Sequence, residues 1–327
     1  MARYEAVVIE APGGPEVLSI DTVEVRDPGY GEVRVEVAAA GLNRADLLQR
    51  MGRYPAPPGV PPNVPGLEFA GVVETVGPGV REWKAGDRVM GIVGGGAMAR
   101  AVTVHARELV PVPAGLSLVD AAAIPEAFMT AWDAVVRQGA LVSGEWVLIH
   151  AAASGVGTAA VQIVRRMGAR SIATTRTPAK TGKLKHLGAD RVVVSKEGFV
   201  QPVREIAPEG VDLILDLVGG DAVADNLELI RTTGRYVLVG LLGGRQASLD
   251  LGVVLRRRVR LFGTVLRARP LEEKIALAQD FARQVLPGFD EGTLEPVVEL
   301  VLPMVQVAEA HETMARGAHV GKIVLAW

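Results

Sequence analysis

One segment of the sequence has small residues at the spacing of a phosphate-binding turn. In WVLIHAAASGVGTAAVQIVRRMGA an apolar strand leads into Ala152, Ser154 and Gly157, the three small positions of a G-x-G-x-x-G pattern, with Gly155 adding freedom inside the turn. An amphipathic helix follows directly. Such a turn lets backbone N–H groups at a helix N-terminus approach a pyrophosphate. The segment predicts a dinucleotide site, although the same small residues could merely let a helix pack on a strand.

The next strand, SIATT, ends in basic rather than acidic residues. NAD-preferring sites place an Asp or Glu about 20 residues beyond the turn, where it binds the ribose 2′-hydroxyl. Here Thr175 is followed by Arg176 and then by Lys180, which could hold a 2′-phosphate with a planar fork and a point charge. We therefore expect NADPH as the cofactor. The alternative is that both are solvated charges, as expected for Lys183 and Lys185.

Six short apolar strands alternate with helices from about residue 121 and predict the domain that positions this turn. Continuous apolar strands separated by helices indicate a parallel sheet covered on both faces. We expect a doubly wound α/β Rossmann domain over residues 121–266. Gly219-Gly220 and Gly243-Gly244 follow two of the strands, where ligands of such sheets bind. The strands are WVLIH, SIATT, RVVVS, VDLILDLV, YVLVGL and VRLFGTV.

The remainder of the chain has a different pattern. Residues 1–120 contain short strands broken by Gly and Pro, one helical insert, RADLLQRM, and a proline-rich loop from Tyr54 to Pro65. They predict a GroES-like antiparallel β domain. Because a lone C-terminal strand needs a sheet to join, we expect residues 267–327 to complete this domain with α+β character. The elements expected there are a helix at 271–286, a strand near 297–302, a helix at 308–316 and the strand KIVLA.

The composition excludes several kinds of chemistry. The 327 residues include no cysteine, so disulfides, thiolate zinc sites, iron–sulfur clusters and cysteine nucleophiles are excluded. The formal net charge of -2 provides no long-range positive field for nucleic acid or anionic membranes. No stretch approaches the roughly 18 apolar residues of a membrane span. We expect a cytoplasmic protein without nucleic-acid or membrane partners, and no metal. The histidines have no metal-ligand spacing: His105, His150, His186, His311 and His319.

From end to end the chain resembles the medium-chain dehydrogenase/reductase family. GLEFAGVVETVGPGVREWKAGDRVMG is similar to the family signature, in which G-H-E-x-A-G precedes a V-G and G-D-x-V pair. Zinc-dependent members have a ligand His where this chain has Leu67 and a ligand Cys where it has Asn43. The zinc-free quinone oxidoreductase branch is resembled most, through AGLNRADLLQRMGRYP, AAAIPEAFMTAW and HAAASGVGTAA. This branch is zeta-crystallin-like, and the p53-inducible quinone oxidoreductase subgroup is the most similar.

This resemblance implies a zinc-independent NADPH:quinone oxidoreductase that transfers hydride or electrons to a small quinone. It implies a homodimer formed through the strand VRLFGTV. Tyr54 and the proline-rich loop would form the quinone mouth, and Asn43 and Tyr54 are weak candidates for a catalytic role. The residues implied to contact the cofactor are Asn43, Asp46, Thr130, Ala152, Ser154, Gly155, Val156, Gly157, Thr175, Arg176, Lys180, Val239, Gly240, Leu241, Val265, Leu266 and Arg267.

Departures from the family pattern keep other functions open. Many zinc-free relatives have Tyr where this chain has Leu48, and many have Tyr where it has Ser195. An NADPH-dependent enoyl-thioester (2-enal or enone) reductase would use the same scaffold but benefits from a positioned acid, and the sequence indicates none. A non-catalytic, crystallin-like NADPH-binding protein is the second alternative. Glu68 is expected to be a buried hydrogen-bonding residue, and Asp216 to orient a loop or else approach the cofactor.

Overall fold

The computed structural model describes residues 2–327, apart from the side chain of Glu197, and the chain divides into two compact units. Unit 1 comprises Met1–Met129 and Leu266–Trp327, and unit 2 comprises Thr130–Val265. The boundaries expected at 120/121 and 266/267 therefore shift to 129/130 and 265/266. The reason is packing, because the ring of Phe128 meets that of Phe289 edge to face at 4.9 Å, within unit 1.

Unit 2 is built on a six-stranded parallel sheet, as the sequence predicted. The strand order is β10-β9-β8-β11-β12-β13, so successive connections run outward in both directions from the centre of the sheet. The order reverses between β8 and β11, which makes their carboxyl ends the topological switch point where ligands bind. The strands are β8 (Trp146–Ile149), β9 (Arg170–Thr175), β10 (Arg191–Val194), β11 (Val211–Asp216), β12 (Ile230–Leu238) and β13 (Arg260–Gly263).

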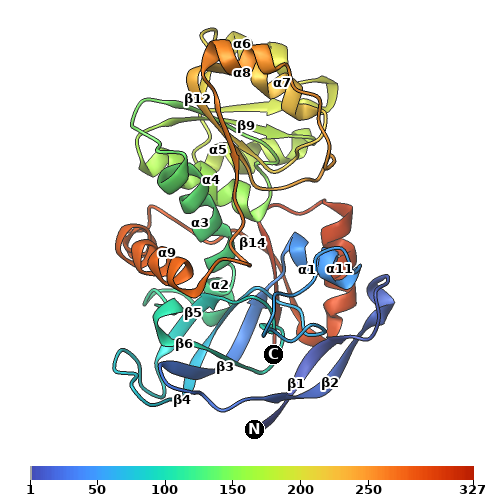
Figure 1. Cartoon of the computed structure of the whole chain (residues 1–327), viewed down its shortest axis with the longest axis vertical. Helices are drawn as coiled ribbons and strands as arrows, with labels where there is room; N and C mark the ends of the chain where they lie inside the picture. Colours follow the sequence, from blue (N-terminus) through green and yellow to red (C-terminus); the bar gives the residue numbers. More distant parts are fainter. Residues whose placement is uncertain (1) are drawn as a thin grey trace. The chain divides into compact units, whose positions relative to one another are not determined.

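Helices cover the parallel sheet because each presents one apolar face. In α4 (Gly155–Arg166) the residues from Gly157 to Val164 are buried, while Arg165 and Arg166 lie in the last turn, where positive charge complements the helix dipole. Helices α6, α7 and α8 lie together over the sheet (Figure 1). In the part of the chain that the structure describes, no helix has the length and apolarity needed to cross a bilayer. The other helices of the unit are α5 (Thr181–His186), α6 (Val200–Ile206), α7 (Ala222–Leu229) and α8 (Leu251–Arg257).

Unit 1 contains a seven-stranded sheet of order β14-β15-β3-β4-β5-β7, with β6 also paired to β3. Strand β15 pairs antiparallel with β3, so the C-terminal segment joins the first domain as expected. Strands β1 and β2 form a separate two-stranded ribbon (Figure 1). The strands are β1 (Ala2–Ile9), β2 (Leu18–Val25), β3 (Glu32–Gly41), β4 (Glu68–Val76), β5 (Arg88–Ile92), β6 (Ala101–His105), β7 (Val110–Pro111), β14 (Val298–Pro303) and β15 (Lys322–Ala326).

The helices of unit 1 close its apolar core. Leu47 of the predicted helical insert is fully buried with Phe69 and Ile323. Residues 125–129 of the helix α3 belong to unit 1, and the rest of that helix belongs to unit 2. The helices are α1 (Arg44–Arg50), α2 (Leu118–Ala121), α3 (Pro125–Trp132), α9 (Leu271–Gln284), α10 (Pro287–Asp290) and α11 (Val307–Arg316).

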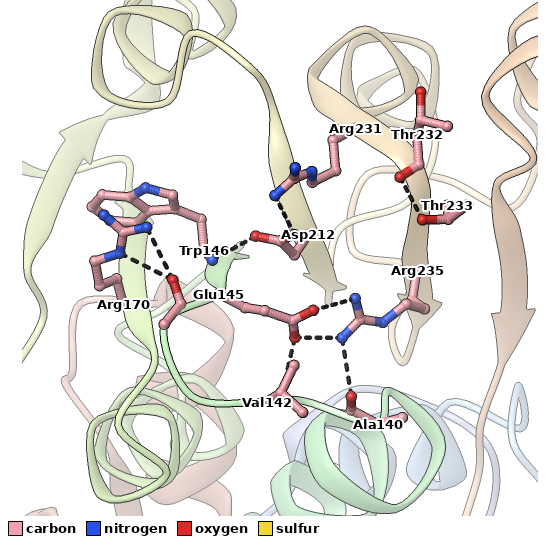
Figure 2. A network of polar contacts seen from close by, with 11 residues as sticks. Ala140, Val142, Glu145, Trp146, Arg170, Asp212, Arg231, Thr232, Thr233 and Arg235 are labelled. Atoms are coloured by element: carbon pink, nitrogen blue, oxygen red, sulfur yellow. Dashed lines mark hydrogen bonds and ion pairs between the residues drawn. The ribbon is translucent and has the colours of Figure 1, made fainter.

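A network of polar contacts holds the amino ends of the strands in unit 2 (Figure 2). Arg235 donates to both carboxylate oxygens of Glu145, at 2.8 and 2.6 Å. The backbone N–H of Trp146 donates to Asp212 at 2.8 Å, and the guanidinium of Arg170 lies 4.3 Å from the centre of the Trp146 ring. Bidentate arginine–carboxylate pairs are among the stronger polar contacts. The polar groups at the amino ends of these strands therefore find their partners within the protein.

Candidate active site

The small-residue turn after β8 is shaped for close approach of backbone to a ligand. Ser154 caps α4 by accepting a hydrogen bond from the N–H of Gly157 at 3.1 Å. A Cβ at Gly157 would lie 2.6 Å from backbone atoms of Ala151 and Ala152, so only glycine lets the helix start here. The N–H groups of Gly155 and residue 156 are in the first turn and have no acceptor within the helix. They can bind an anion.

A positive charge stands at the end of the neighbouring strand. Arg176 follows β9 directly, is exposed, and makes no hydrogen bond or ion pair with another described residue. Lys180 ends a short 3₁₀ turn (Pro178–Lys180) and is half-buried, and Thr175 is buried at the end of β9. No carboxylate takes the place that a ribose-binding acid would fill. The arrangement fits a 2′-phosphate.

The loops that follow β11 and β12 lie against one another at the same edge of the sheet. Gly219 and Gly244 form a parallel bridge, and a Cβ at Gly220 would lie 2.6 Å from the carbonyl oxygen of Gly243. Gly219 and Gly220 have φ of 63° and 59°, the left-handed region that favours glycine. The predicted residues Val239, Gly240 and Leu241 lie in the second loop, where Val239 and Gly240 are half-buried and Leu241 is exposed.

A buried chain of hydrogen bonds positions these loops. Asp216 accepts from the backbone N–H groups of residues 218 and 219 and from the hydroxyl of Tyr236. Asn226 donates to the Tyr236 hydroxyl at 3.0 Å, and its side-chain oxygen lies 2.7 Å from Nε2 of His150. Burial lowers the pKa of His150 and raises that of Tyr236, so both are neutral at pH 7. Of the two roles expected for Asp216, this geometry gives it the loop-orienting one.

The buried hydroxyl of Thr130 has no hydrogen-bond partner among the described residues. The Thr130 side chain is 6% exposed. An unsatisfied buried hydroxyl costs about 1–3 kcal/mol. A ligand that supplied a partner would recover this cost. Together with the turn at residues 155–156 and the charge of Arg176, this hydroxyl fits a phosphorylated nicotinamide dinucleotide.

In unit 1 the predicted residue Asn43 belongs to a buried polar cluster. The Lys322 ammonium donates to Glu68 at 2.6 Å and to the side-chain oxygen of Asn43 at 2.7 Å. The Asn43 amide in turn donates to Glu68 at 2.9 Å. A Cβ at Gly41 would lie 2.4 Å from the Glu68 carboxylate, so a glycine makes room for it. Glu68 is a buried hydrogen-bonding residue, as expected, and it fixes the Asn43 side chain in one orientation.

Asp46 is a further buried polar residue of unit 1. It is fully buried, and its two carboxylate oxygens accept from the backbone N–H groups of Asn43 at 2.8 Å and Gly66 at 3.0 Å. Burial raises its pKa to about 6 against the opposing effect of these hydrogen bonds. The expectation that Asp46 lies near the nicotinamide ribose stays a prediction. Its carboxylate holds the start of α1 and the loop at Gly66 together.

Arg267 and Tyr54 are also placed together. Arg267 is buried and donates to the carbonyl oxygens of Gly94 at 2.6 Å and Tyr54 at 3.1 Å, and to Gln49 at 2.5 Å. Its guanidinium lies 4.9 Å from the centre of the Tyr54 ring. We expected Val265 to Arg267 to close a nicotinamide slot. In the structure Arg267 anchors the proline-rich loop, Leu266 is buried and Val265 is exposed, and the closing of a slot by these residues stays a prediction.

Glu126 is a site residue that the sequence reading missed. Its backbone N–H, in the first turn of α3, donates to Glu68 at 2.8 Å, while its carboxyl group has no hydrogen-bond partner among the described residues. Burial, with a contribution from Glu68, raises the pKa of Glu126 to about 8. A signal was present, because Glu126 is the only charged residue between Asp120 and Asp133.

Among the side chains that the structure describes, no three His, Asp or Glu residues converge on a point that could hold a metal ion. The buried His311 lies 3.4 Å from Arg50, and its pKa is lowered to about 3 by burial and by that charge. His150 belongs to the hydrogen-bonded chain already described. These two histidines therefore have structural environments.

Comparison with known proteins identifies the family. Residues 29–114 match the alcohol dehydrogenase GroES-like domain, and residues 155–282 match the zinc-binding dehydrogenase domain. The human synaptic vesicle membrane protein VAT-1 homolog is 32% identical over 315 residues, which cover 91% of this chain and 79% of that protein. The chain belongs to the medium-chain dehydrogenase/reductase family, and it is an oxidoreductase that uses a nicotinamide cofactor.

Other similar proteins have names that state different activities. A mycocerosic acid synthase-like polyketide synthase of Mycobacterium tuberculosis is 34% identical over 320 residues, which cover 97% of this chain. The chain spans only 15% of the length of that relative. Among solved structures, the quinone oxidoreductase of Pseudomonas syringae pv. Tomato has a TM-score of 0.89 at 29% identity, with 99% and 100% of the two chains covered. The JamJ enoyl reductase has a TM-score of 0.88 at 29% identity and covers 99% of each chain.

Proposed function

We propose that the chain is a zinc-independent, NADPH-dependent reductase of small quinones, in the zeta-crystallin-like branch and closest to the p53-inducible subgroup. The observation that carries the cofactor assignment is Arg176, an exposed and unpaired guanidinium at the end of β9. The likeness to a quinone oxidoreductase over the whole chain supports the acceptor. A flat quinone accepts hydride readily, so no metal is needed to polarise its oxygen.

Residues of the chain can be assigned to each part of the proposed reaction. Bound NADPH supplies the hydride. The N–H groups of residues 155–156 bind the pyrophosphate, Arg176 binds the 2′-phosphate, and the Thr130 hydroxyl gains a partner. In unit 1, Asn43 is held in one orientation by Lys322 and Glu68. Tyr54 and the proline-rich loop form a wall for the acceptor, and Arg267 holds that wall in place.

A second candidate function is reduction of an enoyl thioester, a 2-enal or an enone. The observation that favours it is Glu126, an unpartnered carboxyl whose pKa is raised to about 8 by burial. Such an acid is protonated at neutral pH and can complete a reduction that ends on carbon. The likeness to enoyl reductases of similar length supports the same function.

One assay separates these functions. NADPH oxidation is measured with 1,2-naphthoquinone, benzoquinone and crotonyl-CoA, and with a simple alcohol and a saturated aldehyde as controls. We expect turnover of the quinones and none of the controls. Turnover of crotonyl-CoA alone would replace the quinone by the enoyl acceptor. Tight NADPH binding without any turnover would support the non-catalytic alternative and contradict both enzymatic functions.

We also propose a homodimer formed through β13, in the cytoplasm. This strand is the last in the sheet order and pairs with β12 alone among the described strands, and Leu261 on it is 39% exposed. A free sheet edge with apolar side chains favours pairing with a second copy. Light scattering at micromolar concentration should give twice the chain mass, and a monomer would contradict the proposal.

A further inference from the structure

Three side chains of unit 2 join the helix that begins as α3 to the carboxyl end of β13. Thr264, the residue after β13, donates its hydroxyl to Oδ2 of Asp133 at 3.0 Å. The Gln138 amide donates to the same carboxyl oxygen and, at 2.8 Å, to the Thr264 hydroxyl. Asp133 and Thr264 are buried, and all three residues belong to unit 2. We refer to these three residues as the Asp133 clamp.

The clamp lies where this helix changes its winding. Helix α3 ends at Trp132 and continues directly into a π-helical turn, Asp133–Gln138, after which the Gly139 N–H bonds to the carbonyl oxygen of Ala134. Turns of this kind are rare and occur frequently at functional sites. The first and last residues of the turn both bind Thr264. Two contacts from one turn to one side chain fix both the rotation of the helix and its distance from the end of β13.

Thr130 precedes Asp133 by one turn of the same helix. Residues three apart lie on one face of a helix, so the rotation that the clamp fixes also fixes the direction of the Thr130 side chain. The two hydroxyls differ in their partners. That of Thr264 donates to Asp133 and accepts from Gln138, whereas that of Thr130 is buried without a partner among the described residues. The clamp therefore holds a hydroxyl that is left for a ligand.

The order of the strands indicates which half of a dinucleotide comes to this part of the sheet. Arg176 follows β9, and the small-residue turn at 152–157 follows β8, the neighbour of β9. A dinucleotide with its 2′-phosphate at β9 and its pyrophosphate at β8 extends its nicotinamide half along the carboxyl ends toward β11, β12 and β13. Thr264 follows the last of these strands, and its N–H donates to the carbonyl oxygen of Leu238, the last residue of β12. The clamp is therefore on the nicotinamide side of the sheet.

We propose that the Asp133 clamp positions the Thr130 hydroxyl for the nicotinamide half of NADPH, with Asp133 as a positioning residue that does not touch the cofactor. The inference rests on the proposed function and deepens it. The group that Thr130 binds is a polar group of that half, because a hydroxyl can both donate and accept. The adenosine half is assigned to Arg176 and the turn after β8, which the clamp does not contact. Loss of the clamp should therefore affect the two halves of the cofactor unequally.

The first test compares NADPH with 2′,5′-ADP, which keeps the 2′-phosphate and lacks the nicotinamide half. Thr264→Val removes the hydroxyl that Asp133 binds, while Gln138 keeps its bond to Asp133. In calorimetric titrations the dissociation constant of NADPH should rise about threefold to tenfold, and that of 2′,5′-ADP should change less than about twofold. Thr264→Ser retains the hydroxyl and should retain the NADPH affinity. Arg235→Met, which weakens unit 2 at the amino ends of its strands, should change neither constant.

The second test asks whether the clamp acts through Thr130. Thr130→Val should raise the dissociation constant of NADPH by about the same factor as Thr264→Val. In the double variant the second substitution should add no further loss, because residues that act through one group have non-additive effects. At saturating NADPH, Thr264→Val should lower kcat with 1,2-naphthoquinone at least about tenfold, since a displacement of about 1 Å can cost about a hundredfold. Thr264→Ser should retain the wild-type kcat.

The outcomes separate this inference from the proposed function. Equal losses of affinity for NADPH and 2′,5′-ADP in Thr264→Val would mean that the clamp only holds the fold, and would overturn the inference. Unchanged NADPH affinity in that variant, or additive losses in the double variant, would also overturn it while the proposed function stood. A wild type that binds 2′,5′-ADP no more tightly than 5′-AMP and does not oxidise NADPH would contradict the proposed function, and the inference with it.

Discussion

In unit 2 the amino ends of the parallel strands form one edge of the sheet and their carboxyl ends form the other. The two edges differ in how many of their polar groups have hydrogen-bond partners. At the amino edge, Glu145 and Asp212 are paired with arginines at 2.6 to 2.8 Å and with backbone N–H groups, as Figure 2 shows. At the carboxyl edge, the exposed guanidinium of Arg176 has no partner among the described residues, and Thr130 of helix α3 has a buried hydroxyl without one. Both edges contain charge. The difference indicates that the first edge stabilises the fold and that the second binds a ligand.

The largest effect on ligand binding is expected from a substitution at Gly157. A Cβ there meets three backbone atoms at 2.6 Å, so Gly157→Ala must push α4 away from the turn. A displacement of about 1 Å near a binding centre can cost about a hundredfold, and overpacking costs about 1–3 kcal/mol. We expect NADPH affinity to fall by at least about a hundredfold in a fluorescence titration. Gly182→Ala is the matched control, since nothing lies within 4 Å of its Cβ, and an equal loss of affinity there would refute the argument.

At the amino edge, Arg235→Met should affect folding and not binding. The side chains of Arg235 and Glu145 are 11% and 16% exposed, so the variant leaves a largely buried carboxylate without its partner. Breaking such pairs costs about 3–5 kcal/mol when they are fully buried. We expect a loss of about 2–4 kcal/mol in urea unfolding and an unchanged affinity for NADPH. Arg204→Met, in a pair that is about half exposed, should cost less than about 0.5 kcal/mol.

The same pair predicts a dependence on pH. Burial alone would raise the pKa of Glu145, but hydrogen bonds from Arg235 and from the N–H of Val142 lower it below its ordinary value. A carboxyl with a depressed pKa in the folded state stabilises the protein above its unfolded pKa of about 4.3, and this contribution is lost as the pH falls through the folded value. The stability gap between the wild type and Arg235→Met should therefore narrow below about pH 4. A gap that stayed constant down to pH 3 would assign the loss to packing.

At the carboxyl edge, Arg176→Ala should narrow the cofactor preference. Loss of one charge-assisted contact costs about 1.5–3 kcal/mol, so the dissociation constant of NADPH should rise about ten- to a hundredfold while that of NADH stays the same. Arg191→Ala removes an exposed arginine from the amino end of β10 and should change neither constant. Equal affinities of the wild type for NADPH and NADH would disprove the assignment of the 2′-phosphate site.

The smallest effect is expected at Thr130. Thr130→Val removes a hydroxyl that has no partner, so the free energy of unfolding without cofactor should not fall, while NADPH affinity should fall about threefold to tenfold. Thr174→Val removes a buried hydroxyl that lies 3.0 Å from Nδ1 of His150, and it should cost about 1 kcal/mol of stability. If both variants lost the same stability, the contrast between satisfied and unsatisfied groups would fail at this position.

Local sequence patterns predicted the features of unit 2 that depend on neighbouring residues. The six strands, the turn at Ala152 to Gly157 and the position of Arg176 after β9 all follow from periodicity and spacing within a few residues. The cluster of Asn43, Glu68 and Lys322 joins residues up to 279 positions apart, and no local pattern encodes that proximity. These three residues could therefore be recognised as one cluster only from the structure.

The environments of two further residues also depend on contacts that local patterns do not encode. Asp46 and Arg267 are polar residues at positions that the family resemblance linked to a cofactor, but tertiary packing buries both. A buried polar group must be hydrogen-bonded, and each is occupied by backbone carbonyl or N–H groups of distant loops. The unit boundary after Met129 likewise depends on a distant contact. Phe128 packs against Phe289, which lies 161 residues further along the chain.

The position of β15 in the sheet of unit 1 has a consequence for synthesis on the ribosome. This strand lies between β14 and β3 and contributes Lys322, whereas all of unit 2 is translated between β3 and β15. Domains generally fold as units while the chain emerges. The nascent chain therefore completes unit 2 first, while residues 39–41 at the end of β3 lack the β15 partner and Glu68 lacks its cation. Until β15 emerges, that open edge is the part of the molecule most exposed to aggregation.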